Sequence, residues 1–291
     1  MKDITRLLCM VLLSFLVVTG CSRRDILDDY PVSGVEVRLD WNGVTEKLPE
    51  GVRIIFYPKD EKGRKIDTYL SVTGGEVKVP SGHYAVVIYN YDTETVLIRG
   101  EESYETIQAY TNFCKLGIAG TEKMVWGPDP LYVVNIDDLD IQNSEETLIL
   151  KLKPKLVIRT YSFSIKVQGL SNVSNVIGSI GGMADHYFLG KAYAMCDDYP
   201  INIDLNVKAG KIEGVFTTFG LPEAIITRLE IKLPVMMNLM IIKVDNSVQE
   251  VKINITEAVQ EPTGGGEGGE GEETKPPALV EVEIEDEIKV D

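Results

Sequence analysis

Apolar and polar residues alternate with a period of two along most of this sequence, and this pattern limits the fold more than any other feature. The first clear case is the segment 35–41, whose apolar residues are Val35, Val37, Leu39 and Trp41. Such alternation places the apolar side chains on one face of a half-buried β-strand. Because similar segments recur at short intervals without long helical patterns between them, we expect an all-β fold of antiparallel β-sandwiches.

Turns rich in Gly, Pro, Asn and Asp separate the predicted strands. Further strands are expected at 52–57, 76–79, 83–91, 95–98, 131–136, 148–152, 156–167, 201–207, 214–219, 225–233, 235–244 and 248–255. One short helix is expected near 103–110, where Ser103 and Glu105 offer capping side chains. The hydrophobic share of 44% suffices for a sizeable core. The length suits two sandwich domains, which we place at 33–150 and at 151–260 plus 279–291.

The first twenty residues have the features of an export signal. Lys2 and Arg6 give a basic start, and 7–18 form an apolar run shorter than the ~20 residues of a membrane-spanning helix. The sequence of 18–21, Val-Thr-Gly-Cys, resembles the bacterial lipobox, in which the Cys carries lipid and the peptide before it is removed. We expect a signal peptide over 1–20, lipid attachment at Cys21 and a tether over 21–32. The alternative is an ordinary secretory signal that happens to end in a cysteine.

Acyl chains on Cys21 would hold the protein at a membrane without a spanning helix. Ser22 is not the Asp that retains bacterial lipoproteins in the inner membrane, so the outer membrane is the expected location. Asp25, Asp28 and Asp29 resemble the acidic signal that directs lipoproteins to the cell surface, although Arg23 and Arg24 interrupt that signal.

The C-terminal region combines a linker with a strand. The Gly- and Glu-rich segment 261–278 has almost nothing from which to build a core, and we expect it to be a flexible linker. The clearest strand pattern in the chain follows it, with apolar residues at Val280, Val282, Ile284, Ile288 and Val290. The region 257–291 holds 12 acidic and two basic side chains, and so carries most of the net charge of -16.

The residue types argue against nucleic-acid binding and catalysis. A nucleic-acid-binding surface needs clustered Lys and Arg, which a net charge of -16 does not favour. His83 and His186 lack a neighbouring His or Cys for a metal pair. The acidic segment at 135–140 has Leu139 where a calcium loop needs a ligand. We therefore interpret the histidines as structural and the acidic segment as a solvated turn, and expect no catalytic residues, cofactor or metal.

Two cysteines are expected in the folded body. Cys9 leaves with the signal peptide and Cys21 takes lipid, so Cys114 and Cys196 remain. A disulfide between them is compatible with an oxidising compartment. Two buried free thiols are equally compatible with the sequence.

Several segments together resemble a Bacteroidetes family of lipoproteins of unknown function that is similar to the fimbrillin-type proteins, including Mfa-like and fimbrial anchor subunits. Besides the lipobox and the strand 35–41, they are Gly74-Gly75, VPSGHY at 79–84, YNYDTE at 89–94, GGMA at 181–184 and FTTFG at 216–220. The resemblance implies two transthyretin-like β-sandwich domains, outer-membrane attachment and a role in surface fimbriae or adhesion. It implies no active site, so a non-enzymatic protein is expected.

In fimbrillin-type assembly, a terminal strand of one subunit completes a sheet of its neighbour, which uses backbone hydrogen bonds for affinity. The segment 280–290 has the form of such a donor and would bring other fimbrial subunits as partners. The alternative, which we favour, is that it closes a sheet of its own C-terminal domain, because the linker is long enough to reach back.

A different class of function is glycan binding in a polysaccharide-uptake system. There, Trp41, Trp126 or the tyrosines would stack on sugar rings, and the partner would be a host or glycan ligand. Trp41 lies on an alternating apolar face and is expected in the core, so Trp126, in a predicted loop, is the candidate.

Overall fold

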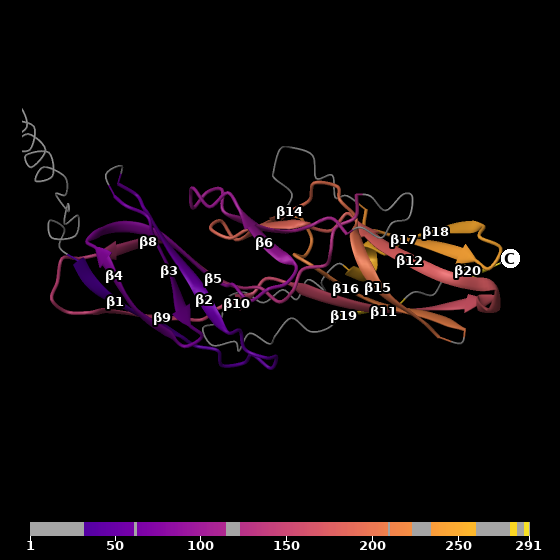
Figure 1. Cartoon of the computed structure of the whole chain (residues 1–291), viewed down its shortest axis with the longest axis horizontal. Coiled ribbons are helices and arrows are strands. Elements are labelled where there is room, and N and C mark those ends of the chain that lie inside the picture. Colours follow the sequence, from indigo (N-terminus) through magenta and orange to yellow (C-terminus); the bar gives the residue numbers. More distant parts are fainter. Residues whose placement is uncertain are drawn as a thin grey trace, which may run out of the picture.

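Two eight-stranded sheets and one four-stranded sheet form the part of the chain that the computed structural model describes: residues 32–60, 63–114, 123–208, 210–222, 234–259, 280–283 and 288–290. The molecule is elongated, with β1 (Val32–Leu39) near one end and β20 (Ile288–Lys289) at the other (Figure 1). Within these ranges, helical residues are confined to α2 (Thr256–Val259) and a 3-10 turn at Leu170–Asn172, and no helix is long and apolar enough to span a membrane. The prediction of an all-β fold is confirmed.

The first sheet contains the N-terminal strands in the order β10-β8-β5-β2-β3-β4-β1-β9. Its further members are β2 (Gly51–Pro58), β3 (Ile66–Ser71), β4 (Gly74–Pro80), β5 (Gly82–Asn90), β8 (Tyr132–Ile141), β9 (Leu148–Leu152) and β10 (Lys155–Leu156). Neighbouring strands are antiparallel, except that β9 runs parallel to β1. The alternation behaves as expected on β1, where Val35 and Val37 are buried.

The central strands β2 and β5 are buried on both faces. Ile54 and Phe56 of β2 belong to one apolar core together with Ile88 of β5. Ile55 of β2 and Val87 of β5 point to the other face and belong to a second core. Continuous burial of this kind explains why both strands read as runs of apolar residues rather than as a strict alternation.

The second large sheet contains the C-terminal strands in the order β18-β17-β12-β15-β16-β11-β19, and β20 also pairs with β11. Its members are β11 (Arg159–Gln168), β12 (Val173–Gly181), β15 (Ile201–Lys208), β16 (Lys211–Thr218), β17 (Met236–Lys243), β18 (Val248–Asn254), β19 (Val280–Glu283) and β20. The start of β15 pairs with β12 and its end pairs with β16. A strand that changes partners in this way forms a corner between two layers, and a third apolar core lies against these strands.

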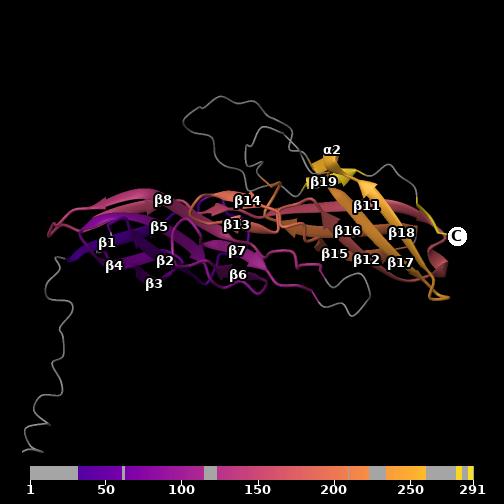
Figure 2. The ribbon, with the colours of Figure 1, turned by 90° about the horizontal axis from the view of Figure 1, so that it is seen from above.

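The four-stranded sheet joins the two parts of the chain. Its order is β14-β13-β7-β6, where β6 (Val96–Arg99) and β7 (Gln108–Thr111) precede residue 150, and β13 (His186–Phe188) and β14 (Tyr193–Met195) follow it. The sheet lies at mid-length of the molecule in both views (Figures 1 and 2). The core beneath it likewise combines Tyr57 and Tyr104 with Leu189 and Phe219.

Two local predictions are wrong. The segment predicted as a short helix forms a single turn, in which the carbonyl of Ser103 accepts hydrogen bonds from the N–H groups of Thr106 and Ile107, and the chain then enters β7. The acidic segment 135–140 is not a turn but part of β8, in which the three aspartates are exposed and Ile136 and Leu139 are half-buried. The predicted strand 225–233 and the predicted linker 261–278 lie outside the described residues.

Candidate functional site

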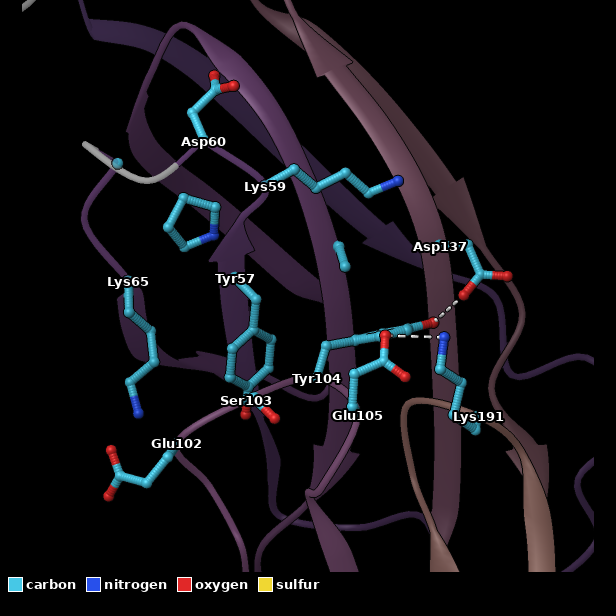
Figure 3. A pocket seen from close by; sticks show the side chains of 13 residues that line it. Tyr57, Lys59, Asp60, Lys65, Glu102, Ser103, Tyr104, Glu105, Asp137 and Lys191 are labelled. Atoms are coloured by element: carbon cyan, nitrogen blue, oxygen red, sulfur yellow. Dashed lines mark hydrogen bonds and ion pairs between the residues drawn. The ribbon is translucent and has the colours of Figure 1, made fainter.

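An open groove of about 580 Å³ lies where β2, β5 and β8 meet the turn at 102–105 and the β13–β14 hairpin (Figure 3). Its lining includes two tyrosines, three lysines and four carboxylates, and the complete lining is Tyr57, Pro58, Lys59, Asp60, Gly63, Lys65, Ala85, Glu102, Ser103, Tyr104, Glu105, Asp137 and Lys191. These residues come from distant parts of the sequence. No local motif indicates them, so the sequence alone does not reveal this site.

The tyrosines form the base of the groove. The rings of Tyr57 and Tyr104 meet edge to face, with centroids 6.2 Å apart. The Tyr57 hydroxyl donates to the carbonyl oxygen of Glu101 at 3.2 Å, and the Tyr104 hydroxyl donates to Oδ1 of Asp137 at 2.8 Å. Burial raises the pKa of both phenols well above the ordinary range, so both remain protonated donors at neutral pH.

Ion pairs form the rim. Lys191 pairs with Glu105 at 2.9 Å (Figure 3), and its ammonium lies 5.2 Å from the centre of the Tyr104 ring. Lys59 pairs with Asp138 at 3.1 Å. The hydrogen bond with Glu105 raises the pKa of Lys191, and the hydrogen bond from Lys59 lowers the pKa of Asp138. Both shifts favour the charged forms of Lys191 and Asp138.

The predicted C-terminal strand lies beside β11. In parallel register, Val280 and Val282 of β19 are opposite Tyr161 and Phe163, and Ile288 of β20 is opposite Val167. The side chains of Ile288 and Val290 are buried in the core of the second large sheet. Ile284 lies outside the described residues, as does Cys21.

The end of this strand is fixed by specific contacts. The backbone N–H of Val290 donates to the carbonyl of Gln168 at 3.0 Å, and Nε2 of Gln249 donates to the carbonyl of Lys289 at 2.8 Å. Gly169 adopts a left-handed backbone, and a Cβ atom there would lie 2.3 Å from the carbonyl oxygen of Val290. The close approach of the two segments therefore requires glycine at this position.

The tryptophans occupy different environments. Trp41 packs against the first core as predicted, and its indole N–H donates to the carbonyl of Val72 at 2.7 Å. Trp126 is 38% exposed. Its backbone N–H bonds the carbonyl of Asn112. Its role in glycan binding stays a prediction.

The histidines have carboxylate neighbours that the sequence did not indicate. The exposed His83 lies 3.5 Å from Asp138 and 3.7 Å from Asp140. The buried His186 bonds Oδ1 of Asp185 through Nδ1 at 2.6 Å. Across the described ranges, Asp185, His186 and Asp197 are the one group of three side chains close enough to share a metal ion. Oδ2 of Asp185 accepts hydrogen bonds from the backbone N–H groups of Asp197 and Tyr199. This carboxylate therefore has a structural role.

The question of a disulfide has a direct answer in the structure. Cys114 and Cys196 are both free, the first buried and the second partly buried. Of the two alternatives left open by the sequence, the free thiols are the ones observed.

Comparison with known proteins identifies the family. Residues 20–204 match the model of the domain of unknown function DUF5119. The chain is 51% identical over 293 residues to a protein of Bacteroides ovatus named "Putative fimbrium anchoring subunit Fim4B", with coverage of 97% of this chain and 88% of the relative.

Solved structures share the fold. A Bacteroides ovatus crystal structure described as a "putative adhesin" is 49% identical, with a TM-score of 0.78 and coverage of 94% of this chain and 97% of the other. The fimbrial anchor protein Mfa2 from Porphyromonas gingivalis is 14% identical, with a TM-score of 0.54 and coverage of 80% and 86%, a likeness that concerns the fold alone. The resemblance to the fimbrial anchor type of protein is thus confirmed, and the chain belongs to the DUF5119 family.

Proposed function

We propose that this protein is a lipid-anchored subunit that attaches fimbriae to the surface of the cell. The observation that carries the proposal is the 51% identity, across 97% of this chain, to a relative named as a fimbrium anchoring subunit. Its role is structural or adhesive and involves no enzymatic reaction. Its partners are a membrane and other fimbrial subunits.

The shape of the molecule suits attachment at one end. Cys21, the proposed lipid site, precedes Val32 at the start of β1 by eleven residues, and β1 lies near the opposite end of the long axis from β20 (Figure 1). A lipid on Cys21 would therefore hold the β1 end near the outer membrane and direct the β20 end away from it. This orientation leaves the β20 end available to other subunits.

The domain organisation that we propose places one β-sandwich over 33–150 and a second over 151–260 plus 279–291, with a flexible linker over 261–278. The two eight-stranded sheets support two such units, but the first sheet extends past residue 150, because it includes β9 and β10 (Lys155–Leu156). The pairing of β13 with β7 across it adds a rigid connection between the two parts, which would transmit force along a fimbrial anchor.

We also propose that residues 280–290 close the sheet of their own C-terminal domain. The parallel pairing with β11 and the burial of Ile288 and Val290 support this role. The competing donor role, in which the segment completes a sheet of a neighbouring subunit, makes a distinct prediction. If a chain ending at Gln260 folds and assembles like the full-length chain, the donor role is excluded.

Deletion of the gene tests the anchoring function. The expected result is that fimbriae form but move from the cells to the culture medium, measured by immunoblotting of both fractions. Expression of the full-length chain from a plasmid should return them to the cells. If the fimbriae stay on the deletion strain, this protein does not anchor them.

A further inference from the structure

We propose that Asp185, His186 and Asp197 form a binding site for one zinc ion. In the described part of the chain, they are the one group of three His, Cys, Asp or Glu side chains whose ligand atoms lie within 4.8 Å of one another. The inference is independent of the proposed anchoring function. The sequence does not predict this site, because Asp197 reaches His186 only through the fold.

The fold brings the three side chains together at the four-stranded sheet. His186 begins β13, and its backbone lies opposite Tyr110 of β7 and Met195 of β14. Asp185 directly precedes β13, and Asp197 follows the end of β14 by two residues. The site therefore lies at mid-length of the molecule (Figure 2), beside the strand pairing that joins the two parts of the chain.

The distances suit a single metal ion. Nδ1 of His186 lies 2.6 Å from Oδ1 of Asp185 and 3.9 Å from Oδ2 of Asp197. Ligand atoms around a tetrahedral zinc ion, with bonds of about 2.0 to 2.2 Å, are roughly 3.3 Å apart. The contact with Asp185 must widen and the contact with Asp197 must shorten, each by less than about 1 Å. Since the side chain of Asp197 is 51% exposed, it has room for this movement.

The types of ligand atom favour zinc over calcium and magnesium. Imidazole nitrogen combined with carboxylate oxygen is a typical ligand set for zinc, whereas calcium and magnesium take oxygen ligands. The two carboxylates balance the charge of a divalent cation. An ion bound at Nδ1 leaves the ring proton of His186 on Nε2, and water can supply a fourth ligand from the solvent side.

Two of the ligands are held in place before an ion binds. The side chains of Asp185 and His186 are 4% and 5% exposed. Oδ2 of Asp185 accepts the backbone N–H of Asp197 at 2.9 Å, which fixes the carboxylate and holds the Asp197 backbone close to it. The ring of His186 meets that of Phe188 edge to face, with centroids 5.7 Å apart. Supporting contacts of this kind orient metal ligands and strengthen binding.

Arg99 competes with a metal ion for Asp197. Its guanidinium, on β6, lies 3.8 Å from the same Oδ2 atom that is nearest to His186. The two side chains are 46% and 51% exposed, and an exposed ion pair of this kind is weak. A bound zinc ion would displace Arg99, so removal of Arg99 should favour the metal. A purely structural hydrogen bond between Asp185 and His186 carries no such expectation.

Calorimetry on the full chain tests the proposal. The protein is purified in detergent, freed of metal with a chelator that is then removed, and titrated with zinc chloride. We expect one zinc ion per chain. Asp197→Ala removes a ligand at the surface and should weaken zinc binding by at least about tenfold. Arg99→Ala removes the competing cation and should tighten zinc binding several-fold.

The matched control is Asp138→Ala. Asp138 is also an exposed aspartate beside a histidine, 3.5 Å from Nδ1 of His83, and its loss should leave the affinity for zinc unchanged. Thermal unfolding without metal checks that each variant retains its fold. Added zinc should raise the unfolding temperature of the wild-type chain and of Asp138→Ala more than that of Asp197→Ala.

Three results would each overturn the proposal. The first is that the wild-type chain takes up no zinc, and the second is that calcium or magnesium binds as tightly as zinc. The third is that folded Asp197→Ala binds zinc as tightly as Asp138→Ala does. None of these results bears on the anchoring function, which is measured from the location of fimbriae.

Discussion

The backbone N–H of Val290 donates to the carbonyl oxygen of Gln168 at 3.0 Å, which joins the end of the C-terminal strand to the end of β11. The pairing is parallel, and β19 lies in contact with α2, the element that precedes it in the described part of the chain. The C-terminal strand and β11 thus form one edge of the second large sheet.

Replacement of Ile288 by alanine should destabilise the protein. The Ile288 side chain is 6% exposed and lies in the core of this sheet, and truncation of a buried isoleucine to alanine costs about 2 to 5 kcal/mol. Urea unfolding measures the loss. Val244→Ala is the matched control, because Val244 is 68% exposed and should change stability by less than about 0.5 kcal/mol. Equal stability of the two variants would mean that the strand does not add to the fold in solution.

Alanine at Gly169 should destabilise the protein more than alanine at Gly210. Both glycines adopt left-handed backbone angles, with φ of +83° and +77°, but a Cβ at Gly169 meets the carbonyl of Val290 whereas one at Gly210 has open space. The backbone strain common to both costs about 1 to 2 kcal/mol. Gly169→Ala adds a steric clash that must displace β20. Equal losses in urea unfolding would contradict the close contact between these two segments.

The two free cysteines should react slowly with iodoacetamide in the native protein. Burial raises the pKa of the Cys196 thiol to about 11 and also raises the pKa of Cys114. At pH 8, only about one Cys196 in a thousand would then be the reactive thiolate. Because the folded pKa lies above the unfolded one, the thiol favours the folded state at neutral pH and loses this contribution as the pH rises from about 9 to 11.

Peptide mass spectrometry distinguishes this state from a disulfide. In denaturant without a reducing agent, the peptides that contain Cys114 and Cys196 should both be alkylated rapidly. Alkylation that requires a reducing agent would mean that the two cysteines are bonded, which would contradict the free thiols.

The sequence predicts the positions of strands better than it predicts which strands pair with each other. The alternation at Val35 and Val37 identified β1 because burial on one face leaves a period of two in the residues themselves. It could not show that β13, after residue 150, pairs with β7, since that pairing depends on a hydrogen-bond register between distant segments. The sequence predicts a turn near Asp138 because several acidic residues lie close together there. In the structure these residues belong to β8, and their side chains are exposed to solvent.

The sequence alone does not predict the groove, for a related reason. Tyr57 and Tyr104 read as ordinary core aromatics, and Lys191 reads as an exposed loop residue. The close contact between Gly190 and Tyr104 places the lysine at the groove. The C-terminal strand, in contrast, has a regular pattern of its own, and its apolar positions could be identified without any knowledge of its partner.

The most direct test of the account is the location of fimbriae in cells that produce the Cys21→Ser variant. Cys114→Ser serves as the control because it also removes one thiol but leaves Cys21, the proposed lipid site, unchanged. Quantitative immunogold microscopy and immunoblotting measure the fraction of fimbriae attached to cells. We expect most fimbriae to be released into the medium by Cys21→Ser and retained with Cys114→Ser. Fimbriae that stay on Cys21→Ser cells as they do on wild-type cells would contradict the account.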